Sequence, residues 1–595
     1  MLSHFYDIIK EEWSEMMRDL KYILGYLKYF KKDLILAISL IIIETIFELI
    51  IPFLMKDIID EGIHNENMNQ ILISGGLIIG CALISLVTGH FYAKYNARLV
   101  TNFSYALRKD LFQKIQGYSF SNLDHFPTSS LVTRITNDVT IMQNTLVGGI
   151  RPLCRSPLML FMGIGLSFAM APKIAWIFIA FVPILALILF LIIRKTAPKY
   201  SLLQGNIDEL NQVVRENVQA IRTVKSYVRE EHEMEKFQSA NTKVMSTTKN
   251  TFKFAQLNQP SFQLVMYAVT VMILGFGSVL VHSNDLKVGS LSALLSYILQ
   301  VVNSLMMISN VFLLINRSFA SSRRLKEVLT EEPTITSLAS GLKIIESGTI
   351  EFQNVYFKYK ESSEEYVLDN INLQIHSGES IGILGGTGSS KSTLVSLILR
   401  LYDVTEGKVL IHGQDVKAYD LKALRDSIAI VLQNNVLFSG TIKENLLWGN
   451  ASATMEEVIE ACKIACAEEF IQRLPNGLEY DLGQGGVNVS GGQKQRLCIA
   501  RALLKRPKVI IFDDSTSACD METERQILKG IRSLKNVTSI IIGQRITSVM
   551  EADRIIILDS GKIVDIGTHN ELLQQSEIYK ELYQQQLGGA CQCHQ

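Results

Sequence analysis

The sequence predicts an all-α membrane domain of six spanning helices, followed by an α/β domain. Three observations predict this class. The 595 residues are 48% hydrophobic and only 19% charged, which is too apolar for an ordinary soluble chain of this size. The first half holds six long apolar runs. The second half alternates short strand-like and helical segments around a glycine-rich turn, so we expect a soluble domain fused to the membrane domain.

Charge and cysteine content narrow the classes of partner. Lys plus Arg and Asp plus Glu each number 58, so no overall field attracts nucleic acid, and we expect no nucleic-acid partner. The eight cysteines lack the spacing of a disulfide framework, as expected for reduced thiols facing a cytosol. Cys462 and Cys466 are expected to pack in a core. The tail at 588–595 carries the soft metal ligands Cys591 and Cys593 but is expected to be a frayed end.

The segment before the first apolar run, residues 1–33, mixes charged and aromatic residues at helical spacing. It is too polar for a span and lacks the pattern of a signal peptide. We expect a cytoplasmic elbow helix that lies at the membrane interface.

Six apolar runs predict six membrane-spanning helices within residues 34–325. The runs cover residues 34–58, 70–95, 145–170, 173–195, 262–282 and 288–315. Each is close to or above the ~20 residues that cross ~30 Å of hydrocarbon as a helix. The charged stretches at about 94–140 and 194–258 keep helical periodicity, so we expect the helices to extend beyond the bilayer.

Lys and Arg are distributed unevenly around these runs. The loop at 60–69 has neither, whereas residues 1–33 and the two charged stretches are rich in both. Cytoplasmic loops carry such an excess of positive charge. We therefore expect both termini and the second domain on the cytoplasmic side of a cell membrane, with the lipid bilayer as a partner.

Four charged residues interrupt the apolar runs. Glu44 and Glu48 share one face of the first predicted span, and Arg151 and Arg155 share one face of the third. An ionisable group at membrane depth is costly unless it meets a partner or a watery cavity. Either the four pair and lock two helices together, or the glutamates line a substrate pathway and attract cations. Periodicity leaves both alternatives open.

A polar linker at 326–345 precedes residues 346–587, where strand-like and helical segments alternate. Within this domain, SIGILGGTGSSKSTLVSLILRLY has the order strand, glycine-rich turn and helix that a phosphate loop requires. The residues expected to bind ATP here are Gly385, Thr387, Gly388, Ser389, Ser390, Lys391, Ser392 and Thr393. Backbone N–H groups and the Lys391 charge would face the phosphates, and the Ser392 hydroxyl would ligate Mg²⁺.

The apolar segment Val509–Phe512 predicts a strand buried on both faces, and it ends at Asp513 and Asp514. Asp513 is therefore expected to hold Mg²⁺. Two acids after an apolar run also fit a simple strand-ending turn. The phosphate loop upstream favours the metal.

Between these two elements, the segment NVSGGQKQRLCIARALLKRPKVIIFDD resembles the ATP-binding cassette (ABC) transporter family. The residues that match its signature sequence are Ser490, Gly491, Gly492 and Gln493. Such a turn offers a hydroxyl, bare backbone N–H groups and a positive helix end to an anion. The resemblance implies that this turn closes over a nucleotide bound to a partner cassette.

Further positions follow the family pattern. Tyr359 matches the aromatic that stacks on adenine, and Gln433 matches the glutamine that senses the γ-phosphate and ligates the metal. Residues 515–520 resemble the D-loop, with Cys519 in place of a leucine. The resemblance covers nearly the whole chain and is closest to the exporter branch, which implies ATP and Mg²⁺ as cofactors.

Three residues of the chain's own nucleotide site depart from the family pattern. Ser390 replaces a glycine, Asp514 replaces the glutamate that polarises the attacking water, and Gln544 replaces a histidine that contacts the γ-phosphate. Aspartate withdraws its carboxylate by roughly 1 to 1.5 Å, and ~1 Å of misplacement can cost about 100-fold in rate. Glutamine can donate a hydrogen bond but cannot carry the proton of an imidazole. Gly483 and Gln484 also replace a charged pair before the signature.

These departures, beside an intact signature, predict the degenerate half of a heterodimeric bacterial ABC exporter, similar to the multidrug pairs. The partner would be a second half-transporter chain, and the substrate a hydrophobic or amphipathic small molecule. The alternatives are an ATP-gated regulatory membrane protein and a lipid or peptide exporter, including a homodimeric one. The spans exclude soluble cassette proteins, and the fusion of both domains disfavours an importer. A peptide-processing exporter is disfavoured because no protease segment precedes the first span.

Overall fold

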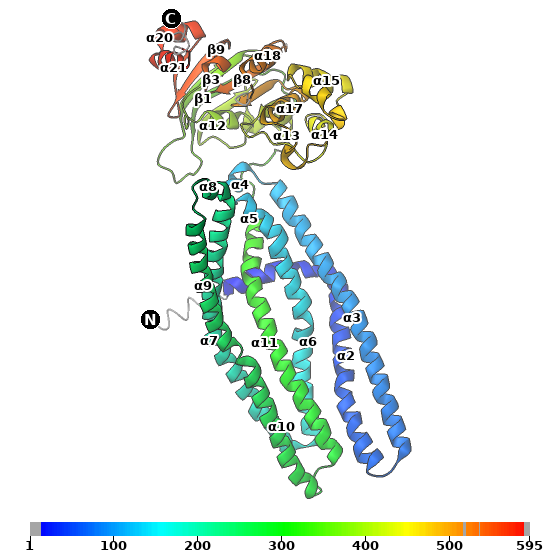
Figure 1. The fold of residues 1–595 in the computed structure, drawn as a ribbon. Helices are drawn as coiled ribbons and strands as arrows, with labels where there is room; N and C mark the ends of the chain where they lie inside the picture. The colour runs from blue at the N-terminus through cyan, green and yellow to red at the C-terminus, as the bar shows by residue number, and fades with distance from the viewer. Residues whose placement is uncertain (1–13, 339, 516–518, 535, 588–595) are drawn as a thin grey trace. The chain divides into compact units, whose positions relative to one another are not determined.

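In the computed structural model, the chain is described over residues 14–338, 340–515, 519–534 and 536–587. It divides into two compact units. The first contains the residues up to Gln116 together with Thr128–Glu331, and the second contains Gly117–Pro127 together with the chain from Glu332 onward. The loop Gly117–Pro127 thus lies between two helices of the first unit in sequence but belongs to the second unit by its contacts (Figure 1).

The first unit is built of helices. Its elements are η1 (Gly25–Phe30), α2 (Lys31–Asp57), η2 (Ile58–Ile63), α3 (Met68–Gln116), α5 (Thr128–Thr133), η3 (Arg134–Asp138), α6 (Val139–Met170), α7 (Pro172–Gln219), α8 (Ile221–Ser226), α9 (Glu230–Ala255), α10 (Asn258–His282) and α11 (Val288–Thr330). Within the described residues, six helical stretches are long and apolar enough to cross a membrane, which confirms the predicted number. In hydrocarbon the backbone has no water partner, so apolar runs must form continuous helices.

Several of these helices are longer than a bilayer requires. α3 has 49 residues and α7 has 48, so each measures about 70 Å at ~1.5 Å per residue, against ~30 Å of hydrocarbon. The polar extensions of α7 and α9 are joined by ion pairs from Lys236 to Glu216 at 3.0 Å and from Lys243 to Glu209 at 2.7 Å. The extension of these helices beyond the bilayer stays a prediction.

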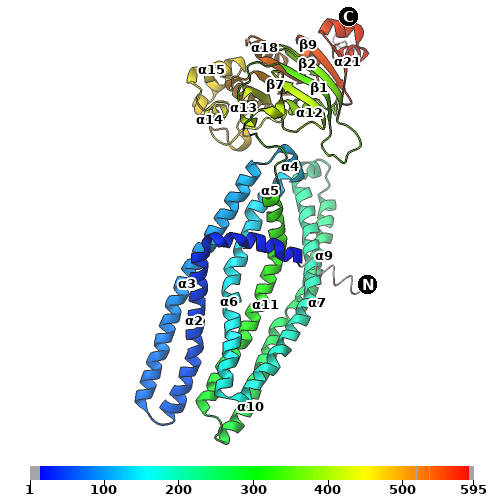
Figure 2. The same cartoon turned by 180° about the vertical axis from the view of Figure 1, so that it is seen from behind.

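Part of the expected elbow helix can be described. Residues 14–24 are helical and lead into η1, whereas residues 1–13 lie outside the described residues. Lys326 on α11 donates a hydrogen bond to Asp19 at 2.6 Å. This ion pair fastens the N-terminal segment to the polar end of α11. Figure 2 shows the helix of residues 14–24 crossing in front of α6 and α11.

The four intramembrane charges form a two-rung ladder between α2 and α6. Arg151 donates to Glu44 and Arg155 donates to Glu48, each across 2.5 Å. Both pairs are separated by 107 residues, so the two helices run in the same direction at this point. The Tyr92 ring of α3 lies 5.7 Å from the Arg151 guanidinium. The structure therefore shows the four charges paired between two helices. A role of these residues in a substrate pathway stays a prediction.

Breaking one rung should cost much more stability than breaking an exposed pair. Glu44→Gln leaves the Arg151 charge without its partner, and such a loss costs about 3 kcal/mol. The Lys173–Asp285 pair, whose side chains are 72% and 54% exposed, is the control, and Lys173→Gln should cost less than ~1 kcal/mol. Melting temperatures of the gently extracted protein compare the two. Equal losses would show that the ladder adds no more stability than a surface pair.

The second unit contains two sheets. The smaller has the strand order β2 (Leu368–Ile375), β1 (Ile350–Phe357), β4 (Glu406–Ile411) and β5 (Gln414–Asp415). The larger has the order β10 (Lys562–Gly567), β9 (Arg554–Asp559), β3 (Ser380–Leu384), β8 (Thr538–Gly543), β7 (Val509–Asp513) and β6 (Ile428–Val431). Its strands are parallel except for β10 at the edge. Parallel strands covered on both faces are continuous apolar runs, which explains their sequences.

Helices and short turns complete the second unit. They are α4 (Phe120–His125), α12 (Lys391–Ile398), η4 (Val416–Ala418), α13 (Leu421–Ser427), α14 (Ile442–Leu447), α15 (Met455–Ile464), α16 (Glu468–Arg473), η5 (Gly477–Glu479), η6 (Gln484–Gly486), α17 (Gly491–Leu504), α18 (Met521–Arg532), α19 (Ile546–Val549), α20 (His569–Gln575) and α21 (Glu577–Leu587).

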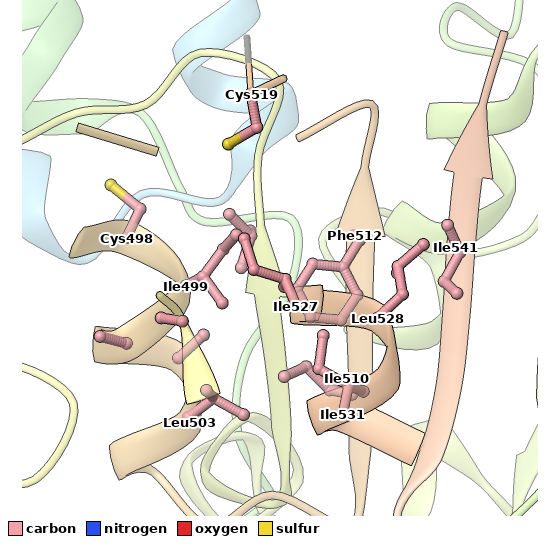
Figure 3. Packing of buried hydrophobic residues seen from close by; sticks show 14 of the residues in the cluster. Cys498, Ile499, Leu503, Ile510, Phe512, Cys519, Ile527, Leu528, Ile531 and Ile541 are labelled. Carbon is pink, nitrogen blue, oxygen red and sulfur yellow. The ribbon is translucent and has the colours of Figure 1, made fainter. Parts of the chain in front are cut away.

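Two hydrophobic clusters cover β7, one with Ile510 and Phe512 and the other with Val509 and Ile511. All five residues of this strand are buried, as the sequence predicts for Val509–Phe512. Figure 3 shows Phe512 and side chains of α17 and α18 packed together in the first cluster. Cys462 is buried in the same cluster, where burial raises the pKa of its thiol to about 12, and Cys466 packs against it. Both cysteines are therefore packing residues, as expected.

Candidate functional site

The turn between β3 and α12 has the backbone of a phosphate loop. Gly388 has φ +86° and Ser390 has φ +70°, so Ser390 adopts the left-handed conformation that a glycine would adopt. For a residue with a Cβ this costs about 1 to 2 kcal/mol. At Gly385 a Cβ would collide with the carbonyl oxygen of Leu558, so this position has room for glycine alone. The serine at 390 therefore strains the loop but keeps its path.

Lys391 lies within the curve of this turn. Its ammonium donates to the carbonyl oxygens of Gly385 at 2.8 Å and Gly386 at 2.7 Å, and to the Ser389 hydroxyl at 3.0 Å. Burial lowers the pKa of Lys391, and the nearby carboxylates of Asp514 and Asp513 oppose that shift. All three hydrogen-bond acceptors are neutral, so the ammonium is a ready partner for an anion.

Ser392 and Asp513 come together at the carboxyl edge of the larger sheet. The Ser392 hydroxyl donates to an oxygen of Asp513 at 2.8 Å. The Asp513 side chain is buried, and burial raises its pKa, while the Ser392 hydrogen bond and the Lys391 charge lower it. Adjacent carboxylate and hydroxyl oxygens are hard donors of the kind that Mg²⁺ prefers.

Asp514 is approached by two glutamine amides. The Nε2 atoms of Gln433 and Gln544 each lie 3.4 Å from one oxygen of Asp514. Asp514 has φ +48°, and its own N–H donates to the carbonyl of Ile542 on β8 at 3.0 Å. Burial raises the pKa of Asp514, against the lowering effect of Lys391 and Arg545. The structure thus places two of the three predicted catalytic residues, Gln433 and Gln544, at the carboxylate of the third, Asp514.

Tyr359 occupies the other end of the site. Its side chain is 49% exposed, and its hydroxyl lies 2.9 Å from the Thr393 hydroxyl on α12. Its ring makes an edge contact with that of Tyr402, with centroids 5.2 Å apart. An exposed ring fixed beside the phosphate loop is a stacking surface for a planar base.

The Ser490–Gln493 turn lies apart from these residues. Ser490 caps α17: its hydroxyl accepts from the Gln493 N–H at 3.3 Å, and the Gln493 side chain accepts from the Ser490 N–H at 2.9 Å. Gly491 is exposed at the helix end, and α17 packs against α14 and α15. Among the described residues, no hydrogen bond joins this turn to residues 385–393. The turn therefore presents its open helix end outward.

Two predictions near the site have only partial outcomes. Gly483 has φ +66°, a backbone angle that glycine tolerates and that residues with a Cβ rarely adopt, and Gly485 has the same φ. Of the D-loop, residues 516–518 lie outside the described residues. Cys519 is buried, with its sulfur 3.2 Å from Oε1 of Gln495 on α17. Cys519 therefore joins the D-loop to the signature helix.

Sequence reasoning missed the residue that supports Gln544. The Gln586 amide on α21 donates to the Gln544 carbonyl at 2.8 Å and accepts from the Ile546 N–H at 2.8 Å. The two contacts fix the loop that presents Gln544 to Asp514. No sequence signal marks Gln586, because it lies 42 residues from Gln544 on an ordinary polar helix face.

Comparison with known proteins identifies the family. The model of the ABC transporter transmembrane region matches residues 34–305, and the ABC transporter model matches residues 368–517. The uncharacterized ABC transporter ATP-binding protein YfiB of Bacillus subtilis (strain 168) is 39% identical over 571 residues, which cover 95% of this chain and 98% of that protein. This chain belongs to the ABC transporter family.

Two further ABC proteins are similar over nearly their full length. One is provisionally named multidrug export ATP-binding/permease protein YgaD of Bacillus subtilis (strain 168), with 30% identity over 584 residues, 95% of this chain and 98% of that protein. The other is a solved structure of a bacterial Atm1-family ABC exporter with ATP bound, with a TM-score of 0.78 and 22% identity, covering 94% of this chain and 98% of that chain. At this identity the second likeness shows the fold.

An ABC ATPase domain implies ATP, normally with Mg²⁺. The described residues fit both. The turn at Gly385 has no room for a side chain, the Lys391 ammonium faces neutral acceptors, and Ser392 with Asp513 supplies hard oxygen ligands. The membrane-spanning helices and the ATPase domain together make the chain a multi-pass ABC transporter protein.

The charge of Asp513 should destabilise the nucleotide-free fold while supporting metal binding. The pKa of Asp513 is raised in the folded state. The loss of folding stability is therefore complete above this raised pKa, and it disappears as the pH falls toward the ordinary pKa of an aspartate. Asp513→Asn keeps an acceptor for Ser392 and should raise the melting temperature of the nucleotide-free protein at pH 7.5. The gain should shrink in acid, and Mg²⁺ should no longer tighten ATP binding.

Thermal unfolding in EDTA at pH 7.5 and pH 5, with ATP titrations with and without Mg²⁺, measures both effects. A lower melting temperature of Asp513→Asn at pH 7.5 would contradict the stability prediction. Retained tightening by Mg²⁺ would contradict the metal role.

Proposed function

We propose that this chain is one half of an ATP-driven exporter of hydrophobic or amphipathic small molecules in a bacterial cell membrane. We further propose that its own ATP site hydrolyses slowly and that a second, related chain completes the transporter. Membership of the ABC family and the name of YgaD support export. The geometry around Asp514, a short carboxylate beside two glutamine amides, is the observation that carries the slow site.

The residues at the carboxyl edge of the sheet would divide the work of binding. Lys391 would exchange its neutral carbonyl partners for phosphate oxygens, and the N–H groups of Gly388 and Ser389 would face the same anion. Ser392 and Asp513 would hold Mg²⁺, which supplies charge neutralisation of the phosphates when bound. Tyr359 would stack on adenine. Binding therefore needs no residue that this chain lacks.

Hydrolysis depends on a base that reaches the attacking water. Burial raises the pKa of Asp514, which makes its carboxylate a stronger base than an exposed aspartate. Reach is the limiting property, because a glutamate would extend the carboxylate by roughly 1 to 1.5 Å. A misplacement of ~1 Å can cost about 100-fold in rate. The site is thus suited to hold ATP longer than it takes to cleave it.

Gln544 would preserve binding without adding catalysis. Its amide is directed at the same carboxylate oxygen as that of Gln433, at 3.4 Å in both cases. An amide donates a hydrogen bond to a phosphate oxygen but carries no titratable proton. The loop fixed by Gln586 would hold this donor in place.

The exposed Ser490–Gln493 turn supports a second chain. Its hydroxyl and the open N-terminus of α17 suit the phosphates of a nucleotide held by another cassette. Two copies of this chain would give two slow sites, whereas a related chain with glutamate and histidine would give one fast site completed by this turn. The chain would have both termini and its ATPase domain in the cytoplasm. ATP binding and cleavage would switch the spanning helices between two access states.

Restoring the longer base should speed turnover at this site. Asp514→Glu combined with Gln544→His is expected to raise ATP hydrolysis by about 10- to 100-fold, because reach and a proton-carrying partner are regained. Phosphate release is measured from assemblies in lipid nanodiscs whose other ATP site is inactivated. Asp559→Glu, at the exposed end of β9, is the matched control and should leave the rate unchanged. An unchanged rate in the double variant with normal ATP binding would mean that reach does not limit this site.

The subunit composition tests the second chain directly. The tagged chain, extracted gently from its native membrane, should bring a related ABC half-transporter in equal amount, as counted by native mass spectrometry. That protein should have glutamate and histidine at the positions of Asp514 and Gln544. Recovery of this chain alone, as a dimer with brisk ATPase activity, would refute the heterodimer. Transport of dyes, lipids or peptides by reconstituted vesicles then separates the substrate classes.

A further inference from the structure

A cluster of aromatic rings connects the adenine end of the site to another part of the second unit. Tyr359 contacts both Phe357 and Tyr402, with ring centroids 4.9 and 5.2 Å apart. Tyr402 contacts Phe357 at 5.7 Å and Phe120 of α4 at 6.1 Å. One ring, that of Tyr402, therefore lies between the proposed base-stacking residue and helix α4.

Tyr402 is also connected to the phosphate loop. It follows α12, whose first residue is Lys391 and whose eight residues span about 12 Å. The turn after this helix is fixed: Arg400 pairs with Asp403 at 2.9 Å, and Arg425 donates to the Arg400 carbonyl at 3.0 Å. The position of the Tyr402 ring is thus set by the same helix that presents the phosphate-binding ammonium.

Helix α4 is held at both ends within the second unit. The Tyr402 hydroxyl donates to Asp124 at 2.8 Å, and burial, together with this bond, raises the pKa of Tyr402, so the phenol stays protonated and donates. At the other end, the Asn122 amide donates to the Glu332 carbonyl at 3.0 Å and the Thr334 N–H donates to the Ser119 hydroxyl at 3.1 Å. In sequence, α4 continues into α3 on one side and α5 on the other.

We propose that Tyr402 is a positioning residue that reports occupancy of the adenine subsite to α4 through its ring contact with Tyr359 and its hydrogen bond to Asp124. This inference rests on the proposed function, because it takes Tyr359 as the base-stacking residue. A base on the half-exposed Tyr359 ring restricts that ring and therefore its edge contact with Tyr402. The restricted phenol then holds Asp124 more firmly. Because coupling is reciprocal, an intact Tyr402–Asp124 bond also favours base binding.

In this mechanism α4 responds to the adenine base and not to the phosphates. A ligand that has phosphates but no base distinguishes these two possibilities. Magnesium tripolyphosphate reaches Lys391 and Ser392 but leaves Tyr359 uncovered. Hydrogen exchange of the backbone amides of residues 117–126 is measured in the full-length chain, in the assembly in which it purifies. The ligands are saturating MgATP and magnesium tripolyphosphate, and the affinity for ATP is titrated on the same samples.

MgATP should slow exchange in this loop by about threefold to tenfold, the range expected for strengthening one charge-assisted hydrogen bond. Tripolyphosphate should slow it little. Tyr402→Phe keeps the ring and Asp124→Asn keeps the shape. Each should remove most of the protection and, because the coupling is reciprocal, weaken ATP binding by a comparable factor of about threefold to tenfold. The double variant should add nothing further. The matched control is Tyr366→Phe, because Tyr366 donates to Glu406 at 2.8 Å elsewhere in the unit. It should keep full protection.

Three results would overturn the inference. If ATP protects the amides of residues 117–126 equally in the wild type and in Tyr402→Phe, Tyr402 does not transmit the signal. If tripolyphosphate protects these amides as well as ATP does, the phosphates alone cause the protection. A loss of protection in Tyr366→Phe as large as in Tyr402→Phe would make the effect a general loss of stability. Failure of the wild type to bind ATP would instead refute the proposed function, on which this role of Tyr402 rests.

Discussion

The nucleotide site depends on the hydrogen-bonded order of three parallel strands. β8 pairs with β3 on one side and β7 on the other, in a fixed register. This order brings Ser392, which follows β3, to within 2.8 Å of Asp513 at the end of β7, although 121 residues separate them. In parallel α/β sheets, ligands bind at the carboxyl ends of the strands. This arrangement brings together the phosphate loop, the Asp513 carboxylate and the loops that carry Gln433 and Gln544.

Both units contain buried charged side chains, which need a compensating partner. The two units provide this compensation differently. In the membrane domain, Glu44 and Glu48 meet arginines of another helix, so the charges are compensated within the chain. In the ATPase domain, Asp513 has a neutral hydroxyl and the partial compensation of Lys391, and its pKa is raised. A carboxylate left under-compensated inside a fold is well suited to a cation that arrives with the substrate.

Two substituted residues show how much a site can change without losing its shape. Ser390 takes the left-handed backbone of the glycine it replaces, so the departure is absorbed as strain of about 1 to 2 kcal/mol. Asp514 also lies at positive φ, which aspartate tolerates better than most residues. In both cases the left-handed backbone is kept; the change adds strain at Ser390 and shortens the side chain at Asp514.

Local sequence patterns are sufficient to predict the six spans, the phosphate loop, the apolar strand before Asp513 and the signature turn. Each depends on local patterns: apolar length, glycines at a turn, or a cap at a helix start. The pairing of Glu44 and Glu48 with Arg151 and Arg155 depends on helix packing, because periodicity gives the face of a helix and not its neighbour. Likewise, the contacts of Gln586 with the Gln544 loop and of Tyr402 with Asp124 join residues 42 and 278 positions apart. Such contacts follow from packing of the whole chain, and no local pattern encodes them.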